Sequence, residues 1–209
     1  ETREKLIQAA FRLMSERGMD AVAINHITEA ADVGLGSFYN HFESKEAIYA
    51  ALNDLVFEGF ADALDGAVKD LEDPAEVIAI SIRHTLLRAR REPRWGRLLV
   101  REGLSVRSLS RGLGARLLRD MEKGIARRRF KLFDPMVAFM LTGAGLLGAV
   151  AAEIDPGGDG DVQRKGFRTE DLPERTAAVV LHHLGVPEAE ARKISRRPLP
   201  AIDRPPLSA

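Results

Sequence analysis

The sequence has no cysteine among its 209 residues, which excludes disulfide bonds, thiolate nucleophiles and cysteine-based zinc sites and fits a reducing cytoplasm. It also lacks a net charge, because 31 basic and 31 acidic residues cancel. Long apolar runs are missing as well. The longest, residues 136–152, contains three glycines and reaches only the short limit for a membrane span. No charged-then-apolar signal segment is visible. We therefore expect a cytoplasmic protein with no membrane partner.

The charges that are present are unevenly distributed. Residues 1–82 carry 6 basic and 16 acidic side chains, whereas residues 83–131 carry 16 basic and 4 acidic ones. A basic segment can mark a nucleic acid or an anionic ligand. The simpler interpretation, which we favour, is that acidic and basic helices pack side by side.

Apolar residues recur at helical spacing along most of the chain, and no stretch alternates as a strand does. The 45% of hydrophobic residues suffice for a core. Capping residues, Gly and Pro set the limits of the helices. The pattern predicts an all-α fold with helices at about 2–17, 24–31, 35–42, 44–71, 74–90, 93–99, 109–125, 135–154, 172–184 and 187–194. A polar loop is predicted at 155–169 and a proline-rich tail at 198–209.

The segment from Ile24 to Phe42 has the form helix, short turn, helix, with Ala30 and Ala31 at the crossing. This form is typical of a helix-turn-helix. Its continuation, VGLGSFYNHFESKEAIYAAL at 33–52, resembles the N-terminal domain of the TetR family of transcriptional regulators. The resemblance covers residues 3–52. It implies a helix-turn-helix DNA-binding domain at 1–52 and a helical ligand-binding and dimerisation domain at 53–197.

Several side chains of this segment suit contacts with double-stranded DNA. Tyr39 and His41 can bond phosphate oxygens, and Gly36 lets the backbone approach the strand. Lys45 offers a cation and free N–H groups at a helix start. Ser37 and Asn40 can reach base edges. We expect these residues to contact DNA, together with Asn25 and Leu35.

The segment also departs from the family pattern. Ala23 stands where a Ser or Thr cap is common, Asp32 where the turn often has Gly, and Leu35 at a frequently polar or basic position. Residues 1–52 hold 5 basic and 8 acidic side chains. We therefore expect a weak nonspecific contribution to DNA affinity.

The resemblance further implies a homodimer whose C-terminal helices enclose a pocket for a small-molecule effector that controls release from a palindromic operator. A repressor is favoured over an activator. We expect a largely apolar pocket with Trp95, Leu99, Phe130 and Phe139. One arginine of residues 83–131 pairs an anionic effector group, or else these arginines face Asp54, Glu58, Asp62 and Asp65. The expected dimer interface comprises Ala144, Gly145, Gly148, Ala152, Val180 and Leu184.

Two other functions compete with this interpretation. Gly143, Gly145 and Gly148 spell GxGxxG, a dinucleotide-binding pattern, but that pattern requires a preceding strand. A nucleotide-dependent enzyme is therefore the less favoured alternative. The acidic N-terminal segment suggests the other, a small-molecule-binding protein with weak or lost DNA binding. We expect no enzyme activity, no cofactor and no metal, since the adjacent His182 and His183 face different sides of a helix.

Overall fold

The computed structural model describes residues 1–104, 111–155 and 170–202. In these ranges every regular element is helical and no strand is present, which confirms the predicted all-α class. The predicted loop beyond Asp155 and the end of the tail, residues 203–209, lie outside the described residues. The helices are α1 (Thr2–Arg17), α2 (Ile24–Ala30), α3 (Leu35–Tyr39), α4 (Lys45–Asn53), the π-helical turn η1 (Asp54–Glu58), α5 (Gly59–Val68), α6 (Pro74–Arg91), α7 (Pro93–Glu102), α9 (Gly112–Ala126), α10 (Pro135–Ile154), α12 (Leu172–His183) and α13 (Glu188–Ser195).

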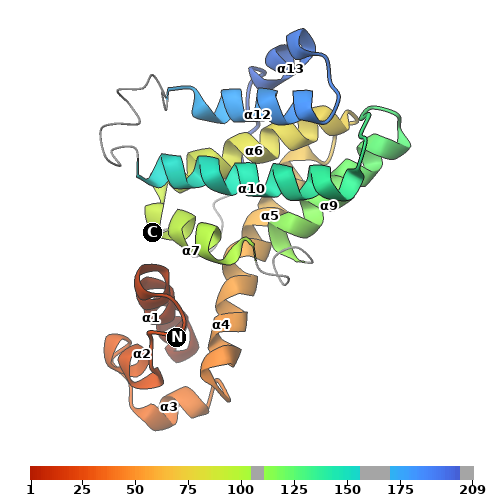
Figure 1. Ribbon diagram of the computed structural model, residues 1–209. Coiled ribbons are helices and arrows are strands. Elements are labelled where there is room, and N and C mark those ends of the chain that lie inside the picture. Colours follow the sequence, from red (N-terminus) through yellow and green to blue (C-terminus); the bar gives the residue numbers. More distant parts are fainter. Residues whose placement is uncertain (105–110, 156–169, 203–209) are drawn as a thin grey trace.

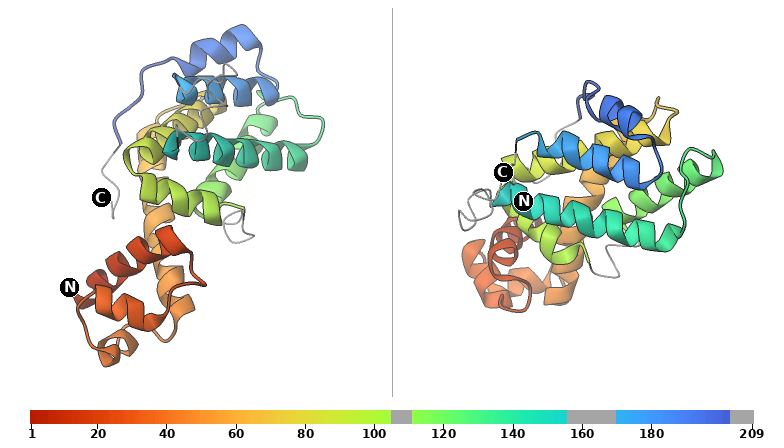
Figure 2. Two further views of the ribbon diagram at one scale, coloured as in Figure 1. Left: turned by 60° about the vertical axis from the view of Figure 1, so that its left-hand side comes forward. Right: turned by 45° about the horizontal axis from the view of Figure 1, so that its top comes forward.

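The helices form two bodies joined by α4. Helices α1, α2 and α3 form a small N-terminal unit, and α4 leads from it through η1 and α5 into the C-terminal body (Figure 1). The left view of Figure 2 shows the same separation. Inside the unit, Phe38 of α3 is fully buried beside Phe42 and anchors the short helix to the core.

The prediction of one α-helix over 44–71 is wrong, because a π-helical turn interrupts it at Asp54–Glu58. The buried residues of this stretch recur every four positions, at 48, 52, 56, 60, 64 and 68. At 3.6 residues per turn, such a stripe rotates steadily around a straight α-helix. A π turn holds more residues per turn and brings the stripe back to one side. This four-residue spacing of apolar residues is the feature of the sequence that indicates the π-helical turn.

Helix α2 begins without a side-chain cap. Ala23 occupies the N-cap with extended backbone angles, and only the reverse half of a capping box is present, in which the Ala23 N–H donates to Nδ1 of His26 at 3.2 Å. Asp32, in the following turn, has a φ of 53°, the left-handed conformation for which glycine is favoured. Ala23 and Asp32 thus depart from the family pattern at the N-cap of α2 and at a left-handed turn position, respectively.

Ala23→Ser is expected to stabilise the protein by about 1 kcal/mol, because a serine hydroxyl at this N-cap accepts a free N–H of the first turn. Urea denaturation followed by circular dichroism measures the change. Ala21→Ser, at an exposed turn position two residues earlier, is the control and should change stability little. Equal effects of both substitutions would contradict the capping argument.

The C-terminal body is built around α6, which packs against α7, α9, α10 and α12. Trp95 of α7 is fully buried, and its ring lies edge-on to Phe60 with 5.1 Å between centroids. The Arg88 guanidinium stacks on both rings, 4.6 Å from the Trp95 centroid and 4.8 Å from that of Phe60. This aromatic cluster belongs to the core of the body.

The beginning of the predicted tail packs against α6 and is not a free linker. The Arg83 side chain donates to the Arg197 carbonyl at 2.6 Å, and the His84 ring lies 3.0 Å from the Pro200 carbonyl oxygen. Leu199 packs on an apolar cluster of α5 and α6. The chain therefore remains part of the body as far as residue 202.

Helix α10 is long and apolar enough to cross a bilayer, by length and composition, with a mean hydropathy of 1.8 and a third of its most apolar stretch buried. It packs against α6, α7 and α12 of the same chain. Near its end, Glu153 is buried and accepts two hydrogen bonds from Arg90 of α6, at 2.7 and 2.8 Å. Helix α10 is thus packed against other helices of the C-terminal body.

Candidate DNA-binding surface and effector cavity

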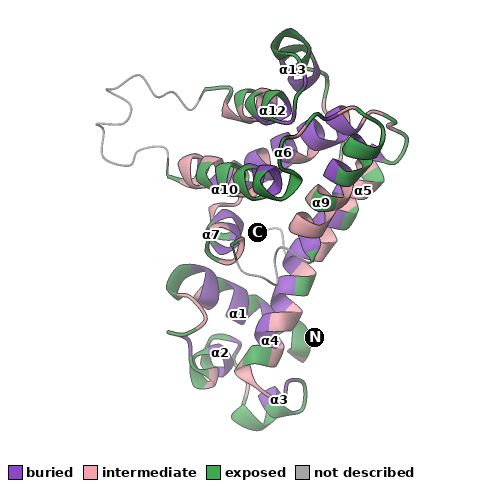
Figure 3. Ribbon diagram, turned by 45° about the vertical axis from the view of Figure 1, so that its right-hand side comes forward, coloured by how far each residue is buried: buried purple, intermediate pink, exposed green. Residues whose placement is uncertain are grey.

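The residues expected to contact DNA lie on one end of the molecule, on α2, α3 and the turn after α3. Leu35 and Tyr39 are about half exposed, at 47% and 55%, and Asn25, Gly36, Asn40 and His41 are exposed (Figure 3). Ser37 is half-buried. Helix α3 is shorter than predicted and ends at Tyr39, so Asn40 and His41 follow it in a turn. The side chains of Tyr39, Asn40 and His41 form no hydrogen bond or ion pair with any residue that the structure describes.

Lys45 differs from these residues because its ammonium group is already engaged. It begins α4 and donates to the Met19 carbonyl at 3.1 Å, which ties the turn between α1 and α2 to α4. The Ser44 hydroxyl accepts from the Ala47 N–H at 3.1 Å. Hydrogen bonds from its own backbone N–H and from Ser44 lower the pKa of Glu46. Lys45 therefore has a structural contact in the free protein.

A cavity of about 130 Å³ lies in the C-terminal body, where η1, α5, α6, α7, α9 and α10 meet. Its wall is mostly apolar, with charged side chains from η1, α5, α7 and α9. The lining residues include Asn53, Phe57, Leu64, Ile78, Ile82, Thr85, Leu99, Leu113, Leu117, Phe139, Leu146 and Leu147, with Asp54, Glu58, Asp65, Glu102, Arg111, Arg116 and Asp120. The cavity thus combines an apolar volume with a polar wall.

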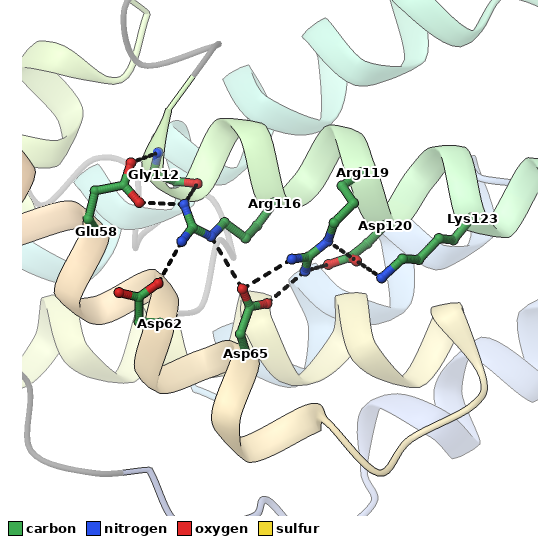
Figure 4. A network of polar contacts seen from close by, with 8 residues as sticks. All are labelled: Glu58, Asp62, Asp65, Gly112, Arg116, Arg119, Asp120 and Lys123. Atoms are coloured by element: carbon green, nitrogen blue, oxygen red, sulfur yellow. Dashed lines mark hydrogen bonds and ion pairs between the residues drawn. The ribbon is translucent and has the colours of Figure 1, made fainter.

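The polar wall is part of an ion-pair network between acidic residues of η1 and α5 and two arginines of α9 (Figure 4). Asp62 and Arg119 belong to the network but do not line the cavity. Arg116 pairs with Glu58, with Asp62 at 2.6 Å and with Asp65 at 3.3 Å. Arg119 donates to both oxygens of Asp65, at 2.7 and 3.1 Å. These contacts confirm the prediction that acidic and basic helices pack side by side.

The network continues at both ends of the two arginines. Arg119 also donates to the buried Asp120, at 2.9 and 3.1 Å, and Lys123 lies 3.6 Å from Asp120. Glu58 accepts from the Gly112 N–H at 2.7 Å, at the start of α9. Gly112 has a φ of 55°, which favours glycine at this position.

The network favours the charged forms of Asp65, Arg116 and Arg119. Burial opposes ionisation of Asp65, but hydrogen bonds from Arg119 and Arg116 outweigh burial and lower its pKa. Burial likewise opposes the charge of Arg116, yet its bonds to Glu58 and Asp65 raise its pKa. Hydrogen bonds to Asp65 and Asp120 raise the pKa of Arg119. Asp65 and the two arginines are thus ionised at neutral pH and already paired with one another.

Of the four residues expected to form the pocket, Leu99 and Phe139 line this cavity, whereas Trp95 and Phe130 do not. Trp95 is held in the aromatic cluster with Arg88 and Phe60. Phe130 packs on α9 so closely that a Cβ at Gly124 would lie 2.0 Å from its ring. Both aromatic residues are core residues. Sequence analysis missed Asn53 and Phe57, because the π turn beside them was not predicted, and it missed Asp120, which α9 places in the wall.

The outward face of α10 is apolar and exposed. It carries Met136, Val137, Met140, Leu141, Ala144, Gly145 and Gly148, and α12 adds Val179, which is 69% exposed. A Cβ added at Gly143, Gly145 or Gly148 meets no described atom within 4 Å beyond its own stretch of helix. Ala152 is half-buried. The structure corrects the expected interface at two residues. Val180 and Leu184 are buried in the core of their own subunit, and Val179 faces outward instead.

The structure removes the basis for a dinucleotide site. Gly143 to Gly148 lie inside the continuous α10, and no strand precedes them in the described residues. The backbone N–H groups there are used within the helix. In the same ranges no group of three or more His, Asp or Glu side chains has the geometry to hold a metal ion.

Comparison with known families matches both parts of the chain. The model for "Bacterial regulatory proteins, tetR family" matches residues 6–52. The model for "Tetracyclin repressor-like, C-terminal domain" matches residues 73–197. Together they account for the N-terminal unit, α6 to α10, α12 and α13.

One similar protein of known structure covers nearly the whole chain, and two further relatives match a smaller part of it. The crystal structure of RolR in complex with resorcinol is 37% identical, covers 97% of this chain and 96% of its own, and has a TM-score of 0.72. The repressor DhaR of Mycobacterium sp. (strain GP1) is 36% identical over 72 residues, and the regulator YvdT of Bacillus subtilis (strain 168) is 34% identical over 84 residues. These two matches cover 34% and 40% of this chain and span only 36% and 43% of the length of DhaR and YvdT.

Proposed function

This chain belongs to the TetR family of bacterial transcriptional regulators, and we propose that it is a homodimeric repressor whose operator affinity is lowered by a small phenolic effector. The observation that carries the proposal is the cavity, whose wall includes the last residue of α4 and the adjoining turn. Helix α4 joins this wall to the unit that carries α3 (Figure 1). Because double-stranded DNA is the partner, we place the protein in the cytoplasm.

The proposed DNA contacts use the exposed end of the N-terminal unit. Helix α3 enters the major groove, where Asn40 and Ser37 reach base edges while Tyr39 and His41 bond phosphates. Gly36 leaves space for the backbone to approach, and Asn25 and Leu35 flank it. Lys45 contributes mainly by holding the turn before α2 through its bond to Met19. A two-fold dimer requires a pseudo-palindromic operator with half-sites about one helical turn apart.

Tyr39→Phe is expected to weaken binding to all DNA sequences by about threefold to tenfold, because one hydrogen bond to phosphate is lost. Asn40→Ala is expected instead to relax base preference at one operator position, at a cost of about 1–3 kcal/mol against the preferred base. Fluorescence anisotropy with an operator obtained by in vitro selection, and with a scrambled duplex, separates the two effects. A uniform loss for Asn40→Ala would contradict its assigned role.

The proposed effector is a neutral molecule with one aromatic ring. Cavities of about 150 Å³ lined by aliphatic and aromatic side chains hold benzene, and this cavity has about 130 Å³. Resorcinol, found in the RolR complex, is a benzene ring with two hydroxyl groups. A phenolic hydroxyl can donate to Asp65 or Asp120 and accept from Arg116. We therefore take resorcinol as the probe for this chain.

An anionic head group fits this wall poorly. Arg116 and Arg119 are paired with carboxylates, and Arg111 lies 3.5 Å from Asp54, so a carboxylate ligand would have to displace an existing partner. Phenol is therefore expected to bind at least about tenfold more tightly than benzoate, because the benzoate carboxylate would face the carboxylates of Asp65 and Asp120. Isothermal titration calorimetry measures both affinities. Tighter binding of benzoate would restore the hypothesis of an anionic effector.

The proposed dimer forms through α10 and α12 of each subunit. The exposed glycines of α10 let a second α10 approach closely, and Met136, Val137, Met140, Leu141 and Val179 supply apolar area. An exposed apolar patch of this kind marks an interaction site. The two-fold arrangement lets both α3 helices reach one operator.

The cavity has two connections to the DNA-binding unit. One is α4 itself. The other is α7, which lines the cavity with Leu99 and Glu102 and contacts α1 through Arg101, whose side chain donates to the Met14 carbonyl at 3.0 Å. Arg94 of α7 also pairs with Glu16 at 3.4 Å. A ligand that shifts α7 or η1 therefore moves the unit that carries α3.

A further inference from the structure

The Asn53 side chain is an unexplained polar group in the wall of the cavity. It lines the cavity as the last residue of α4 and is 8% exposed. Its Oδ1 atom is buried without any hydrogen-bond partner. The amide nitrogen donates to no residue that the structure describes. Within the described residues neither half of the amide has a partner, and the buried oxygen is an exception to the rule that buried polar groups nearly always have one.

Several other polar groups of the same wall are satisfied within the chain. The Thr85 hydroxyl donates to the Ser81 carbonyl at 2.7 Å. Asp65 and Asp120 accept from arginines, and Glu58 accepts from Arg116 and from Gly112. Among the described lining residues, Asn53 is thus the one with a buried polar atom left without a partner, and its amide offers a donor and an acceptor beside an apolar space. A hydroxyl group complements both, because it donates one hydrogen bond and accepts others.

We infer that the Asn53 amide binds a second hydroxyl group of the effector, so that this residue selects a dihydroxylated ring over a monohydroxylated one. This inference rests on the proposed function and adds a selectivity residue to it. One hydroxyl bonds the wall of Asp65, Arg116 and Asp120, and the other bonds Asn53. The cavity provides the apolar space between these contacts for the ring.

The position of Asn53 gives this contact a consequence for DNA binding. Asn53 is followed directly by η1, whose five residues already depart from α-helical geometry. Such π turns are frequently found at functional sites, where a change of hydrogen-bond register is possible. A hydroxyl held by Asn53 acts on the end of α4, the helix that leads to the DNA-binding unit.

The test compares resorcinol with phenol, which lacks the second hydroxyl, on the purified full chain. Calorimetry on the wild type is expected to give about tenfold tighter binding of resorcinol, the value of one hydrogen bond. In Asn53→Leu the preference should fall to about twofold or less, because leucine fills similar space without an amide. The ligand-free variant should also melt at a higher temperature, since a buried unpaired polar group is removed.

Thr85→Val is the matched control, because it removes a hydroxyl of the same cavity that is already bonded to Ser81. Its preference for resorcinol over phenol should match that of the wild type. A retained preference in Asn53→Leu would overturn the inference, and so would a lost preference in Thr85→Val. Failure of both probes to bind the wild type would overturn the inference and the proposed effector class. Operator binding without effector, measured by anisotropy, separately tests the proposal that the chain is a repressor.

Discussion

Replacing Gly148 by leucine is expected to leave the subunit folded and to break the dimer. A Cβ at Gly148 meets no described atom within 4 Å beyond its own stretch of helix, and leucine favours a helix over glycine by about 0.8 kcal/mol. In the proposed dimer, however, the side chain enters a close contact between two α10 helices. Overpacking costs about 1–3 kcal/mol per site, and two-fold symmetry repeats each site. The variant should therefore melt no lower as a subunit and yet sediment as a monomer.

Loss of the dimer carries over to DNA binding. Two linked half-site contacts bind more tightly than one, so the Gly148→Leu variant should bind the operator about a hundredfold more weakly or worse. Gly66→Leu is the matched control, because Gly66 is an exposed helical glycine of α5 with nothing within 4 Å of an added Cβ. It should sediment and bind DNA as the wild type does. A dimeric Gly148→Leu variant in analytical ultracentrifugation would place the interface elsewhere.

Trp95→Ala is expected to have the largest effect on folding. Truncation of a fully buried aromatic residue costs about 3–5 kcal/mol, and this one also supports the buried Arg88 guanidinium. Trp95→Phe should cost less, because a ring remains beside Arg88 and Phe60. Urea denaturation followed by circular dichroism is the suitable measurement, because Trp95 is the one tryptophan and fluorescence is lost with it.

Arg88 provides the contrasting variant. Burial lowers its pKa despite the bond to Glu92, and two of its guanidinium nitrogens are buried without partners. Arg88→Met is therefore expected to leave the free energy of unfolding unchanged or to raise it, since replacing a poorly paired buried charge by an apolar side chain often does.

Trp95→Phe should leave resorcinol affinity nearly unchanged, because Trp95 does not line the cavity. A large loss of resorcinol affinity in Trp95→Phe would contradict this placement and show that Trp95 contributes to the binding site.

The sequence predicted most of the helices well, because helices depend on local patterns. Periodicity and caps placed α1, α10 and α12 within about one residue of their ends. The residues of α3 could be assigned from one contiguous segment. Asp32 was recognised as an unusual turn residue, and its left-handed φ explains why glycine is common there.

The cavity could not be predicted to the same extent, because it depends on contacts between distant segments. Aromatic content suggested Trp95 and Phe130, but tertiary packing placed both in the core. Which side of α12 faces inward was decided by α6, so that Val180 and Leu184 are buried and Val179 is exposed. The pairing of Arg116 with Glu58 and Asp65 was foreseen only as one of two possibilities, because both an effector and an acidic helix satisfy an arginine.

The most direct test of the central proposal is operator binding by the purified full chain with and without resorcinol. In vitro selection should first recover a pseudo-palindromic sequence, and anisotropy on that duplex should give a dimer-dependent affinity. Saturating resorcinol should then weaken binding by at least about tenfold, within the usual range of coupling between two sites. Selection that recovers no symmetric sequence, or an operator affinity unchanged by resorcinol that binds the protein in calorimetry, would contradict the proposal that this chain is an effector-controlled repressor.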